Sequence, residues 1–410
     1  MDRRRFLKYA AAGVAVAGSA LAGYEFDRWQ NSVGRPSVTT VTKTHTLTET
    51  TRLTTTETVR APRVNWLFRG GSAGAPTWDL TMTTPSLEDV QIAVERMLAD
   101  GVDWYELGTS WFMESSSSDD ISPVYDEAML DTNLESRILP TLRDERLEEI
   151  IRLFHENGIK LFLRPGIEIN VPNSWRGTIH PASWDAWFNS YVQFVTHYAS
   201  VASRTEVELL SIGFELNSSV RHTESWNSVI GEVRKAYSGP ISYDCGDLLY
   251  HGTESEYSTE KLGSAWEPVG IGDFLADVDY IGIDWYPRLT NNPNATVKEM
   301  AANAQRLADA FLRPVAERYN EPIFFAEIDY SSVDRTAINP LYYRSGGGAD
   351  ELEQANAFEA IFQTFQDESW FAGMFPTGFY LTVFRDQIGT TNSLWYKQAE
   401  ETFRRWYVGN

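Results

Sequence analysis

From residue 62 onwards, short apolar runs rich in β-branched and aromatic residues alternate with amphipathic stretches of helical spacing. This alternation is typical of a parallel sheet, because two parallel strands need a long crossover connection, which is usually a helix. The apolar runs number eight. Eight parallel strands that alternate with helices close into a (β/α)8 barrel, also called a TIM barrel. The sequence therefore predicts an α/β fold with one large barrel domain over residues 62–410.

The same pattern places the expected elements. Strands are predicted at residues 64–69, 103–108, 160–165, 207–215, 240–244, 278–284, 322–328 and 373–381. Helices are predicted at residues 86–100, 143–157, 183–202, 297–319, 351–367 and 397–406. The active site of such a barrel lies where the strands end, so the last residues of each apolar run are the candidates for chemistry.

The first 24 residues have the features of an export signal. Arg3 and Arg4 precede Phe6-Leu7-Lys8, and a run of small apolar residues extends from residue 9 to residue 23. This order is typical of a twin-arginine signal, and Ala20-Leu21-Ala22 fits a cleavage site. The run is shorter than the roughly 20 residues of a transmembrane helix, and an uncleaved membrane anchor is the alternative. We expect the protein outside the cytoplasm, either extracellular or tethered to the cell surface.

Residues 25–61 are expected to form a linker. Between Val38 and Val59, 12 of 22 residues are Thr, and large apolar side chains are nearly absent. A segment of this composition has too little apolar surface to form a core, so it is expected to stay extended. A Thr-rich stalk between a surface anchor and the barrel is the interpretation that fits both segments.

Composition restricts the partners. Residues from 62 onwards carry 26 Lys and Arg against 52 Asp and Glu, which is a net charge of −26 and argues against nucleic acid. Cys245 is the single cysteine, so the chain forms no internal disulfide. The six His residues show no metal-ligand spacing, and neither a metal nor another cofactor is expected. The 14 Trp residues fit stacking against sugar rings as well as ordinary core packing.

Two carboxylates follow directly on apolar runs that should be buried. The fourth run ends at Glu215 and the seventh at Glu327. A carboxylate is costly to bury without a purpose, and residues at the ends of strands four and seven face one another across the barrel mouth. Hydrolysis of a glycosidic bond needs one protonated carboxyl and one ionised carboxylate. The pair therefore indicates a glycoside hydrolase, although spacing alone does not assign the two roles.

Other interpretations of these strand ends remain open at this point. Each of the two Glu residues would instead form an ion pair with an Arg such as Arg69 or Arg164 in the alternative interpretation. Such a pair would only connect strand ends and would have no catalytic role. Further acidic residues end other runs and are candidates either for supporting the site residues or for binding the substrate: Glu106, Glu168, Asp244 and Asp284. A barrel that binds polysaccharide without cleaving it is the rival from a different class of function.

From Arg63 to Tyr407 the chain resembles glycoside hydrolase family 113, the β-mannanase group within the clan of barrels that carry the acid/base on strand four and the nucleophile on strand seven. The stretches that carry the resemblance are Asp103-Trp104-Tyr105, Thr109-Ser110-Trp111-Phe112, Trp175-Arg176-Gly177, Trp187 to Tyr191, Ile212 to Leu216, Asp279 to Ile283 with Tyr286, and Glu327 to Ser332.

The resemblance implies roles for individual residues. Glu215 takes the role of general acid/base and Glu327 that of nucleophile, with retention of the anomeric configuration. Tyr286 is expected to donate a hydrogen bond to the nucleophile. Trp111, Trp175 and Tyr330 lie in the family-like stretches and are candidates for sugar contacts, with the alternative that Trp175 only anchors its loop. Glu168 is a candidate for substrate binding from its position at a strand end. The expected substrate is a β-mannan-like polysaccharide or oligosaccharide.

Three departures from the family pattern leave the sugar open. After strand three, where members usually carry Lys-Pro-His-x-Asp, this chain has Arg164-Pro165-Gly166-Ile167-Glu168. After strand five, Gly246-Asp247 replaces Asn-Trp. Strand eight offers Phe375, Phe379 and Tyr380 where a Trp platform is usual. Hydrolysis of another β-linked sugar, such as a glucan or a glucosaminide, is therefore the alternative.

One weaker motif points elsewhere. Gly70-Gly71-Ser72-Ala73-Gly74 matches the G-x-S-x-G pattern of serine hydrolases. That motif needs a helix directly after the Ser, whereas Ala75-Pro76 continues as a loop and no suitable Asp and His follow in order. A flexible loop after strand one is the interpretation that the sequence favours.

Overall fold

The structure is a computed structural model, and it forms two compact units, Met1–Arg63 with Gly409–Asn410, and Val64–Val408. It describes residues 40–47, 51–58, 63–73, 85–126, 129–130, 140–172, 174–246, 271–340, 348–382 and 390–409. The expected export signal at residues 1–24 and the side chain of Asp247 lie outside these ranges. Within them, no helix has the length and apolar character needed to cross a membrane.

The first unit contains the Thr-rich segment as two strands. β1 (Thr40–Leu47) and β2 (Thr51–Thr58) pair antiparallel, with Thr40 opposite Thr58 and Leu47 opposite Thr51. Each strand is extended, as the sequence predicts, but the two halves also pair with each other. β-branched Thr favours the extended backbone of a strand, which accounts for this local pairing.

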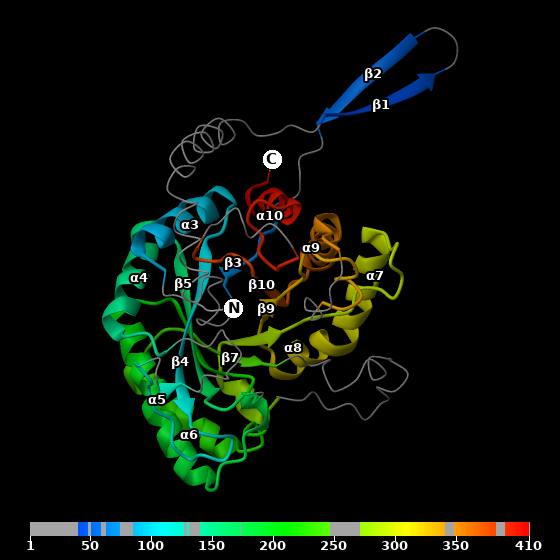
Figure 1. Ribbon diagram of the computed structural model, residues 1–410. Helices are drawn as coiled ribbons and strands as arrows, with labels where there is room; N and C mark the ends of the chain where they lie inside the picture. Colours follow the sequence, from blue (N-terminus) through cyan, green and yellow to red (C-terminus); the bar gives the residue numbers. More distant parts are fainter. Residues whose placement is uncertain are drawn as a thin grey trace, which may run out of the picture. The chain divides into compact units, whose positions relative to one another are not determined.

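Eight parallel strands of the second unit form a closed barrel (Figure 1), which confirms the predicted (β/α)8 fold. Their order around the barrel is β10-β3-β4-β5-β6-β7-β8-β9, so β5 lies opposite β9. The strands are β3 (Phe68–Ser72), β4 (Trp104–Met113), β5 (Lys160–Ile169), β6 (Leu209–Phe214), β7 (Ile241–Cys245), β8 (Tyr280–Asp284), β9 (Ile323–Ile328) and β10 (Phe371–Pro376).

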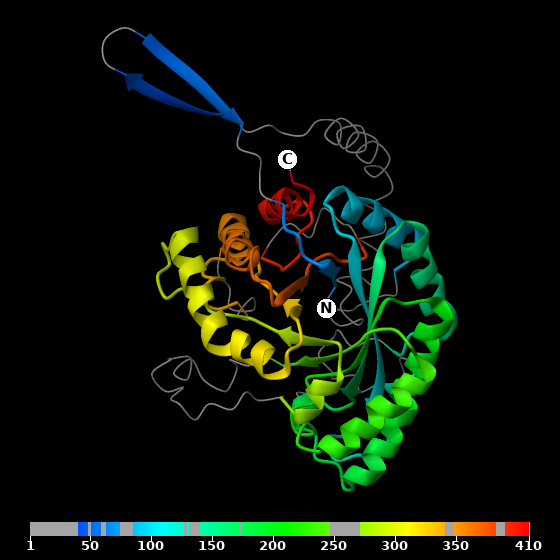
Figure 2. The same cartoon turned by 180° about the vertical axis from the view of Figure 1, so that it is seen from behind.

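Helices cover the outside of the barrel, with α4, α5 and α6 on one side and α7, α8 and α9 on the other (Figures 1 and 2). They are α3 (Leu87–Ala99), α4 (Asp144–Glu156), α5 (Trp184–Thr205), α6 (Thr223–Ala236), α7 (Val297–Leu307), α8 (Arg313–Tyr319), α9 (Glu351–Phe365) and α10 (Gln398–Val408). The short helices η2 (Arg176–Thr178) and η3 (Asp273–Asp277) lie in connections. The single helix predicted at residues 297–319 contains a π-helical turn, η4 (Ala308–Leu312), between α7 and α8.

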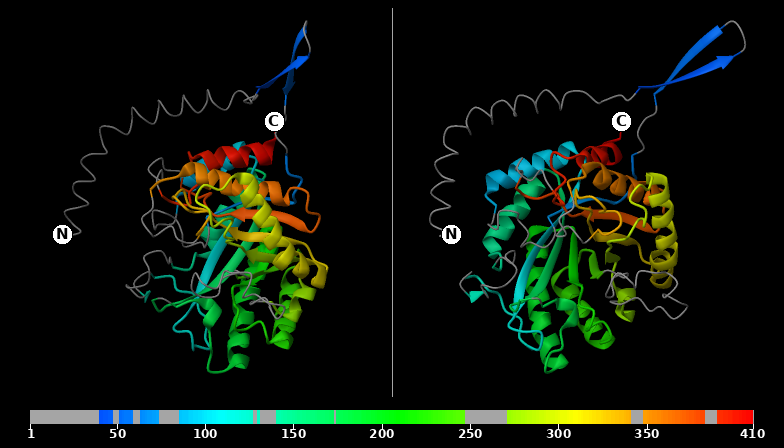
Figure 3. Two further views of the ribbon diagram at one scale, coloured as in Figure 1. Left: turned by 90° about the vertical axis from the view of Figure 1, so that its right-hand side faces the viewer. Right: turned by 45° about the vertical axis from the view of Figure 1, so that its right-hand side comes forward.

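The last helix, α10, closes the ring of helices between α9 and α3 (Figure 3). Arg96 on α3 binds Glu400 on α10 through two hydrogen bonds of 2.5 and 2.8 Å. Trp406 on α10 donates to Glu359 on α9 at 2.7 Å. Glu400 is almost completely buried, so its ion pair with Arg96 is largely shielded from solvent.

The lower interior of the barrel is a layer of aromatic and aliphatic side chains from alternate strand positions: Phe68, Trp104, Phe162, Leu209, Phe324, Ala326, Ala372 and Phe375. A second and larger core lies between the strands and the helices. Because the lower interior is filled, the barrel is closed at that level, and polar chemistry is confined to the end where the strands terminate.

The first and last strands differ from the predicted ranges. β3 runs from Phe68 to Ser72 and therefore includes Gly70 and Gly71, which were expected in a flexible loop. A Cβ on Gly70 would lie 2.4 Å from the Phe375 ring, and one on Gly71 would lie 3.1 Å from Phe379. Glycine thus occurs in this strand because aromatic rings pack directly against its backbone. The predicted loop was wrong for residues 70–72.

Candidate active site

Glu327 is placed by the end of β9, where its carboxylate accepts hydrogen bonds from two sides. Arg164 donates to Oε1 through Nη1, and the Tyr286 hydroxyl donates to Oε2. Burial acts to raise the pKa of Glu327, but Arg164, Tyr286 and Arg176 together outweigh it and hold that pKa below its ordinary value. Glu327 is therefore ionised at neutral pH, which suits a nucleophile.

Arg164 lies on β5 and reaches across the barrel interior to β9. Its guanidinium is fully buried and also binds three buried acids. Nε donates to Asp244 at 3.0 Å, Nη2 donates to both oxygens of Asp284 at 2.7 and 2.8 Å, and Nη1 approaches Glu106 at 3.4 Å. A guanidinium with all its nitrogens engaged has a fixed orientation, so the contact to Glu327 is fixed as well.

The three acids around Arg164 outnumber its single charge. Burial raises the pKa of Glu106 to about 8, despite the attraction of Arg164. Burial also raises the pKa of Asp244 and that of Asp284 above their ordinary values. Glu106 is consequently largely protonated at neutral pH. These acids are too deeply buried to contact a substrate, so of the two roles that the sequence left open they take the supporting one, around Arg164.

Glu215 directly follows β6, where the strand ends irregularly. The pairing with β7 shifts register between Ser211 and Phe214. Glu215 has a φ of 53°, in the left-handed region that is uncommon for residues other than glycine, and its N–H donates to the Asp244 carbonyl at 3.0 Å. Strain of this kind concentrates at functional sites. A partly exposed carboxylate results, with 19% of the side chain accessible, the same fraction as for Glu327.

Two donors from the η2 segment hold Glu215. Arg176 donates from Nη1 to Oε2 at 2.7 Å, and Trp175 donates from Nε1 to the same oxygen at 3.1 Å. Arg176 also binds Glu168 through Nη2 and the Ile167 carbonyl through Nε at 2.9 Å. Glu168 therefore orients Arg176. Burial raises the pKa of Glu168, while Arg176 acts to lower it.

Trp175 is 42% exposed, an unusual value for a Trp that makes a polar contact with a candidate catalytic residue. Its ring packs over Gly177, where an added Cβ would lie 2.3 Å from the indole. Gly177 thus makes room for the indole, and the exposed part of the ring is available for stacking on a sugar. Glu215, Glu327, Tyr286, Glu168 and Trp175 are brought together by the fold.

Two residues expected to contact the sugar, Trp111 and Tyr330, pack between strands and helices and not beside Glu215 and Glu327. Trp111 packs on α5, with its ring centre 5.6 Å from that of Phe194 and 5.4 Å from that of His197. Tyr330 is completely buried, with its ring against Phe358 on α9 and its hydroxyl donating to the Pro287 carbonyl at 3.2 Å. Both rings support the layer between strands and helices.

Arg69 and Arg164, the two arginines considered as partners of the Glu residues, form different ion pairs. Arg69 pairs with Asp103 and with neither Glu215 nor Glu327, whereas Arg164 binds Glu327 as that alternative expected. Arg176, the partner of Glu215, was named only within a family-like stretch and was given no role. Its position beside Trp175 in that stretch was the available signal.

The strand ends that depart from the family pattern are largely closed by packing. Phe375 and Phe379 are fully buried, and Tyr380 is 2% exposed, with its hydroxyl donating to Asn392 at 2.6 Å. None of the three offers an exposed face like that of Trp175. Ser72 is also fully buried as the last residue of β3, so its hydroxyl is not accessible as the nucleophile of a serine hydrolase.

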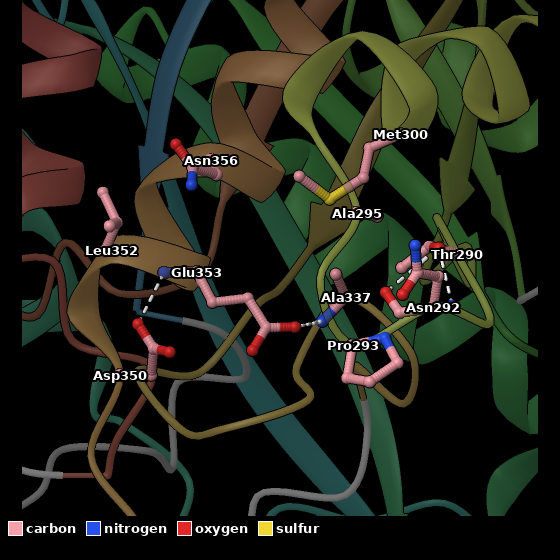
Figure 4. Close-up of a pocket in the computed structure, with 10 residues that line it drawn as sticks. All are labelled: Thr290, Asn292, Pro293, Ala295, Met300, Ala337, Asp350, Leu352, Glu353 and Asn356. Carbon is pink, nitrogen blue, oxygen red and sulfur yellow. Dashed lines mark hydrogen bonds between the residues drawn. The ribbon is translucent and has the colours of Figure 1, made fainter.

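A separate pocket lies near the start of α9 (Figure 4) and shares no residue with the site around Glu215 and Glu327. Asp350 and Glu353 line it, and with Asp334 they form the acidic group whose spacing, within the described ranges, would suit a cation. Glu353 accepts hydrogen bonds from the backbone N–H of Arg335 at 2.6 Å and of Ala337 at 3.0 Å, and Asp350 caps α9. These contacts explain the acids as supports of the loop and the helix.

The chain is similar to known glycoside hydrolases in its sequence pattern and in its fold. The family model described as Glycoside Hydrolase Family 113 matches residues 82–395. A family 113 β-mannanase from Alicyclobacillus acidocaldarius is 23% identical, with a TM-score of 0.64, and the match covers 84% of this chain and 97% of the other. For another structure, of a family 113 β-1,4-mannanase, the identity is 19% and the TM-score 0.63, over 84% of this chain and 99% of the other. A comparison with curated protein sequences found no significant match.

The two solved structures share the barrel fold with this chain, and the family model spans most of that barrel, including β6 with Glu215 and β9 with Glu327. The chain belongs to glycoside hydrolase family 113.

Proposed function

We propose that the protein is a retaining glycoside hydrolase that cleaves β-linked polysaccharides or oligosaccharides, with a β-mannan-like substrate preferred. The observation that carries the proposal is the environment of Glu327, a carboxylate kept ionised by Arg164 and Tyr286 inside a barrel mouth that also holds Glu215. Family membership supports the reaction class. Glu327 acts as the nucleophile and Glu215 as the general acid/base.

In the first step, Glu327 attacks the anomeric carbon of the bound sugar. A bond forms between a carboxylate oxygen and that carbon, and the bond to the leaving oxygen breaks. Glu215 delivers its proton to the leaving oxygen. Both donors to Glu215 fall on Oε2, so Oε1 is the oxygen that carries this proton.

In the second step, a water molecule attacks the anomeric carbon of the glycosyl ester. Glu215 is now the base and takes one proton from the water, while the ester bond to Glu327 breaks. Two inversions give net retention. Arg164 and Tyr286 again stabilise the charge that returns to Glu327 as it leaves.

The preferred sugar follows from the relatives. The two solved structures named above are β-mannanases by their titles, one of them a β-1,4-mannanase. The altered ends of β5, β7 and β10 favour a second candidate, hydrolysis of another β-linked sugar at the same site. The same alterations leave a non-catalytic carbohydrate-binding barrel as a rival, against which the retention of both Glu residues argues.

We also propose that the protein acts outside the cytoplasm. The twin-arginine-like start and the Thr-rich segment support export and an extracellular or cell-surface location, with the N-terminus as a membrane tether. Expression of the full chain in a bacterium with and without an active twin-arginine translocase tests this. Export in both strains would contradict the proposed route.

The test of function uses the purified full chain and a panel of β-linked mannan, glucan and glucosaminide substrates, with the products followed by proton NMR. We expect mannan to be cleaved fastest and the β-anomer to appear first. An α-anomer as first product would contradict the retaining mechanism, and faster cleavage of another sugar would favour the second candidate. Cyclitol aziridine probes of each configuration provide the check for the rival, since binding without covalent labelling by any probe would support it.

A further inference from the structure

Phe214 lies between the two arginines that bind the catalytic carboxylates. Its ring centre is 4.1 Å from the Arg164 guanidinium carbon and 4.5 Å from that of Arg176. The ring is 3% exposed, so both contacts are shielded from water. At these distances the negative face of an aromatic ring attracts a guanidinium, and the attraction is stronger where water is excluded.

The two arginines serve different carboxylates. Arg164 binds Glu327, and Arg176 binds Glu215. Two guanidinium groups in one site repel each other. Acidic partners orient each of them separately, Asp244 and Asp284 at Arg164 and Glu168 at Arg176, whereas the Phe214 ring contacts both. A flat apolar ring with both groups against it fixes their positions and screens their repulsion.

The backbone around Phe214 provides for this placement. The register shift between Ser211 and Phe214 changes the alternation of β6, so that Ser211 binds Asp244 inside the barrel, Gly213 faces Tyr191 and Trp226, and the Phe214 ring lies inside again. A Cβ on Gly213 would lie 2.6 Å from the Tyr191 hydroxyl. Glycine at 213 therefore lets the backbone pass close to Tyr191 where the side-chain alternation of β6 changes.

Gly166 on the neighbouring β5 leaves the room that the ring occupies. A Cβ at this position would lie 2.5 Å from two carbons of the Phe214 ring, closer than real Cβ contacts come. Any larger side chain at 166, including the His expected from the family pattern, is incompatible with the ring in this place. Gly166 and the Phe214 ring therefore depend on each other in this structure.

We propose that Phe214 is a positioning residue that holds the two guanidinium groups in place, each beside its own catalytic carboxylate, with Gly166 as the counterpart that makes room for its ring. The inference rests on the proposed roles of Glu215 and Glu327. Loss of the ring loosens both arginine contacts, and both carboxylates then hold a proton to higher pH. Both limbs of the pH profile of kcat/KM accordingly move upwards, by about half a pH unit.

The charged and titratable groups around Glu327 and Glu215 come from β4, β5, β7 and β8, from η2, and from the residues that follow β8 and β9. None of them is substituted in the variants: Glu106, Arg164, Glu168, Arg176, Asp244, Asp284, Tyr286 and Asp329.

The experiment compares two replacements of Phe214 in the full chain. Phe214→Leu removes the aromatic face and some volume, whereas pentafluorophenylalanine at 214 keeps the ring but reverses the sign of its electrostatic face. Phe162→Leu is the matched control, because Phe162 is a buried ring in the lower barrel core and touches neither arginine. Each protein is assayed for the pH profile of kcat/KM and is crystallised.

We expect both limbs to move up in both Phe214 variants, with kcat reduced more than KM is changed, and at least one guanidinium displaced in the crystal structures. The control should lose stability but keep its pH limbs. Unmoved limbs and unmoved guanidinium groups in Phe214→Leu would overturn the inference. If the wild-type protein cleaves no substrate of the panel, the proposed function fails, and the crystal structures alone decide: displaced guanidinium groups support the inference and unmoved ones overturn it.

Discussion

Arg176 donates from Nη1 to Oε2 of Glu215 at 2.7 Å while its Nη2 binds Glu168. One cation is therefore shared by two carboxylates, and only one of them follows β6 at the position of the acid/base. The competition between Glu168 and Glu215 for Arg176 determines how readily Glu215 gives up its proton. Glu168 is thus a positioning residue for the proposed reaction, and its charge can be removed by substitution with Gln.

Glu168→Gln removes the competing charge and leaves Arg176 to Glu215 alone. The ionised form of Glu215 is then favoured, so the proton-donating form is lost at lower pH. We predict that the alkaline limb of the kcat/KM profile moves to lower pH. Glu149→Gln on the surface of α4 is the control and should leave the profile unchanged. An alkaline limb that stays in place or moves up in Glu168→Gln would show that the shared cation does not act in this way.

Trp175 combines a hydrogen bond and an exposed ring face, and two substitutions separate them. Trp175→Phe keeps an aromatic face but loses the donor to Glu215, so we predict a lower kcat with a modest change in KM. Trp175→Ala loses both and should also raise KM, by about 5- to 50-fold, as expected for a lost stacking contact. Steady-state kinetics on an oligosaccharide checks this. Equal KM values for the two variants would argue against a sugar contact.

Tyr286→Phe removes one of the donors to the Glu327 carboxylate. The pKa of Glu327 is held down by Arg164, Tyr286 and Arg176 against the effect of burial, so loss of the hydroxyl raises it. The acid limb of the profile, below which the nucleophile is protonated, should move to higher pH. Activity should fall by about 10- to 100-fold, the value of a hydrogen bond to a charged group. Tyr319→Phe at the end of α8 serves as control, and an unchanged acid limb in Tyr286→Phe would refute the assignment.

Arg96 on α3 binds the buried Glu400 and stacks on Tyr396, with its guanidinium carbon 3.8 Å from the ring centre. Arg96→Met leaves Glu400 buried without its partner, and we predict a loss of about 2 to 4 kcal/mol in the free energy of unfolding. Lys235→Met breaks an exposed pair on α6 and should cost less than about 1 kcal/mol. Urea denaturation measures both. Similar losses for the two variants would mean that closure by α10 adds little to stability.

Much of the fold was predictable from the sequence because the apolar runs are separate and each ends in a recognisable way. The fourth and seventh runs end in Glu215 and Glu327, and the barrel topology then brings these ends to one mouth. Strand ends were less predictable. β4 extends to Met113, five residues beyond the predicted end at 108. Along this longer strand residue 111 faces away from residue 106, which explains why Trp111 packs on α5.

The partners of the two carboxylates were predictable only in part. Arg164 lies near the predicted end of its strand and was considered as a partner, but its three further acids become neighbours only when the barrel closes. Arg176 lies in a connection after β5, and neither apolar periodicity nor spacing relates it to Glu215. The register shift in β6 that turns Phe214 inwards leaves no signal in composition. Such features arise from tertiary contacts, which a local pattern does not encode.

The central claim is that Glu327 is the nucleophile of a retaining hydrolase, and azide rescue of Glu327→Ala tests it most directly. The variant should lose nearly all turnover, by more than about 10⁴-fold, while its thermal unfolding and circular dichroism stay close to those of the wild-type protein. Azide is small enough to occupy the space of the lost carboxylate and attack the anomeric carbon. We predict that added azide restores cleavage of an activated β-glycoside and yields a glycosyl azide of inverted, α configuration. Near-normal activity in Glu327→Ala, or rescue that gives only the β-azide, would contradict the account.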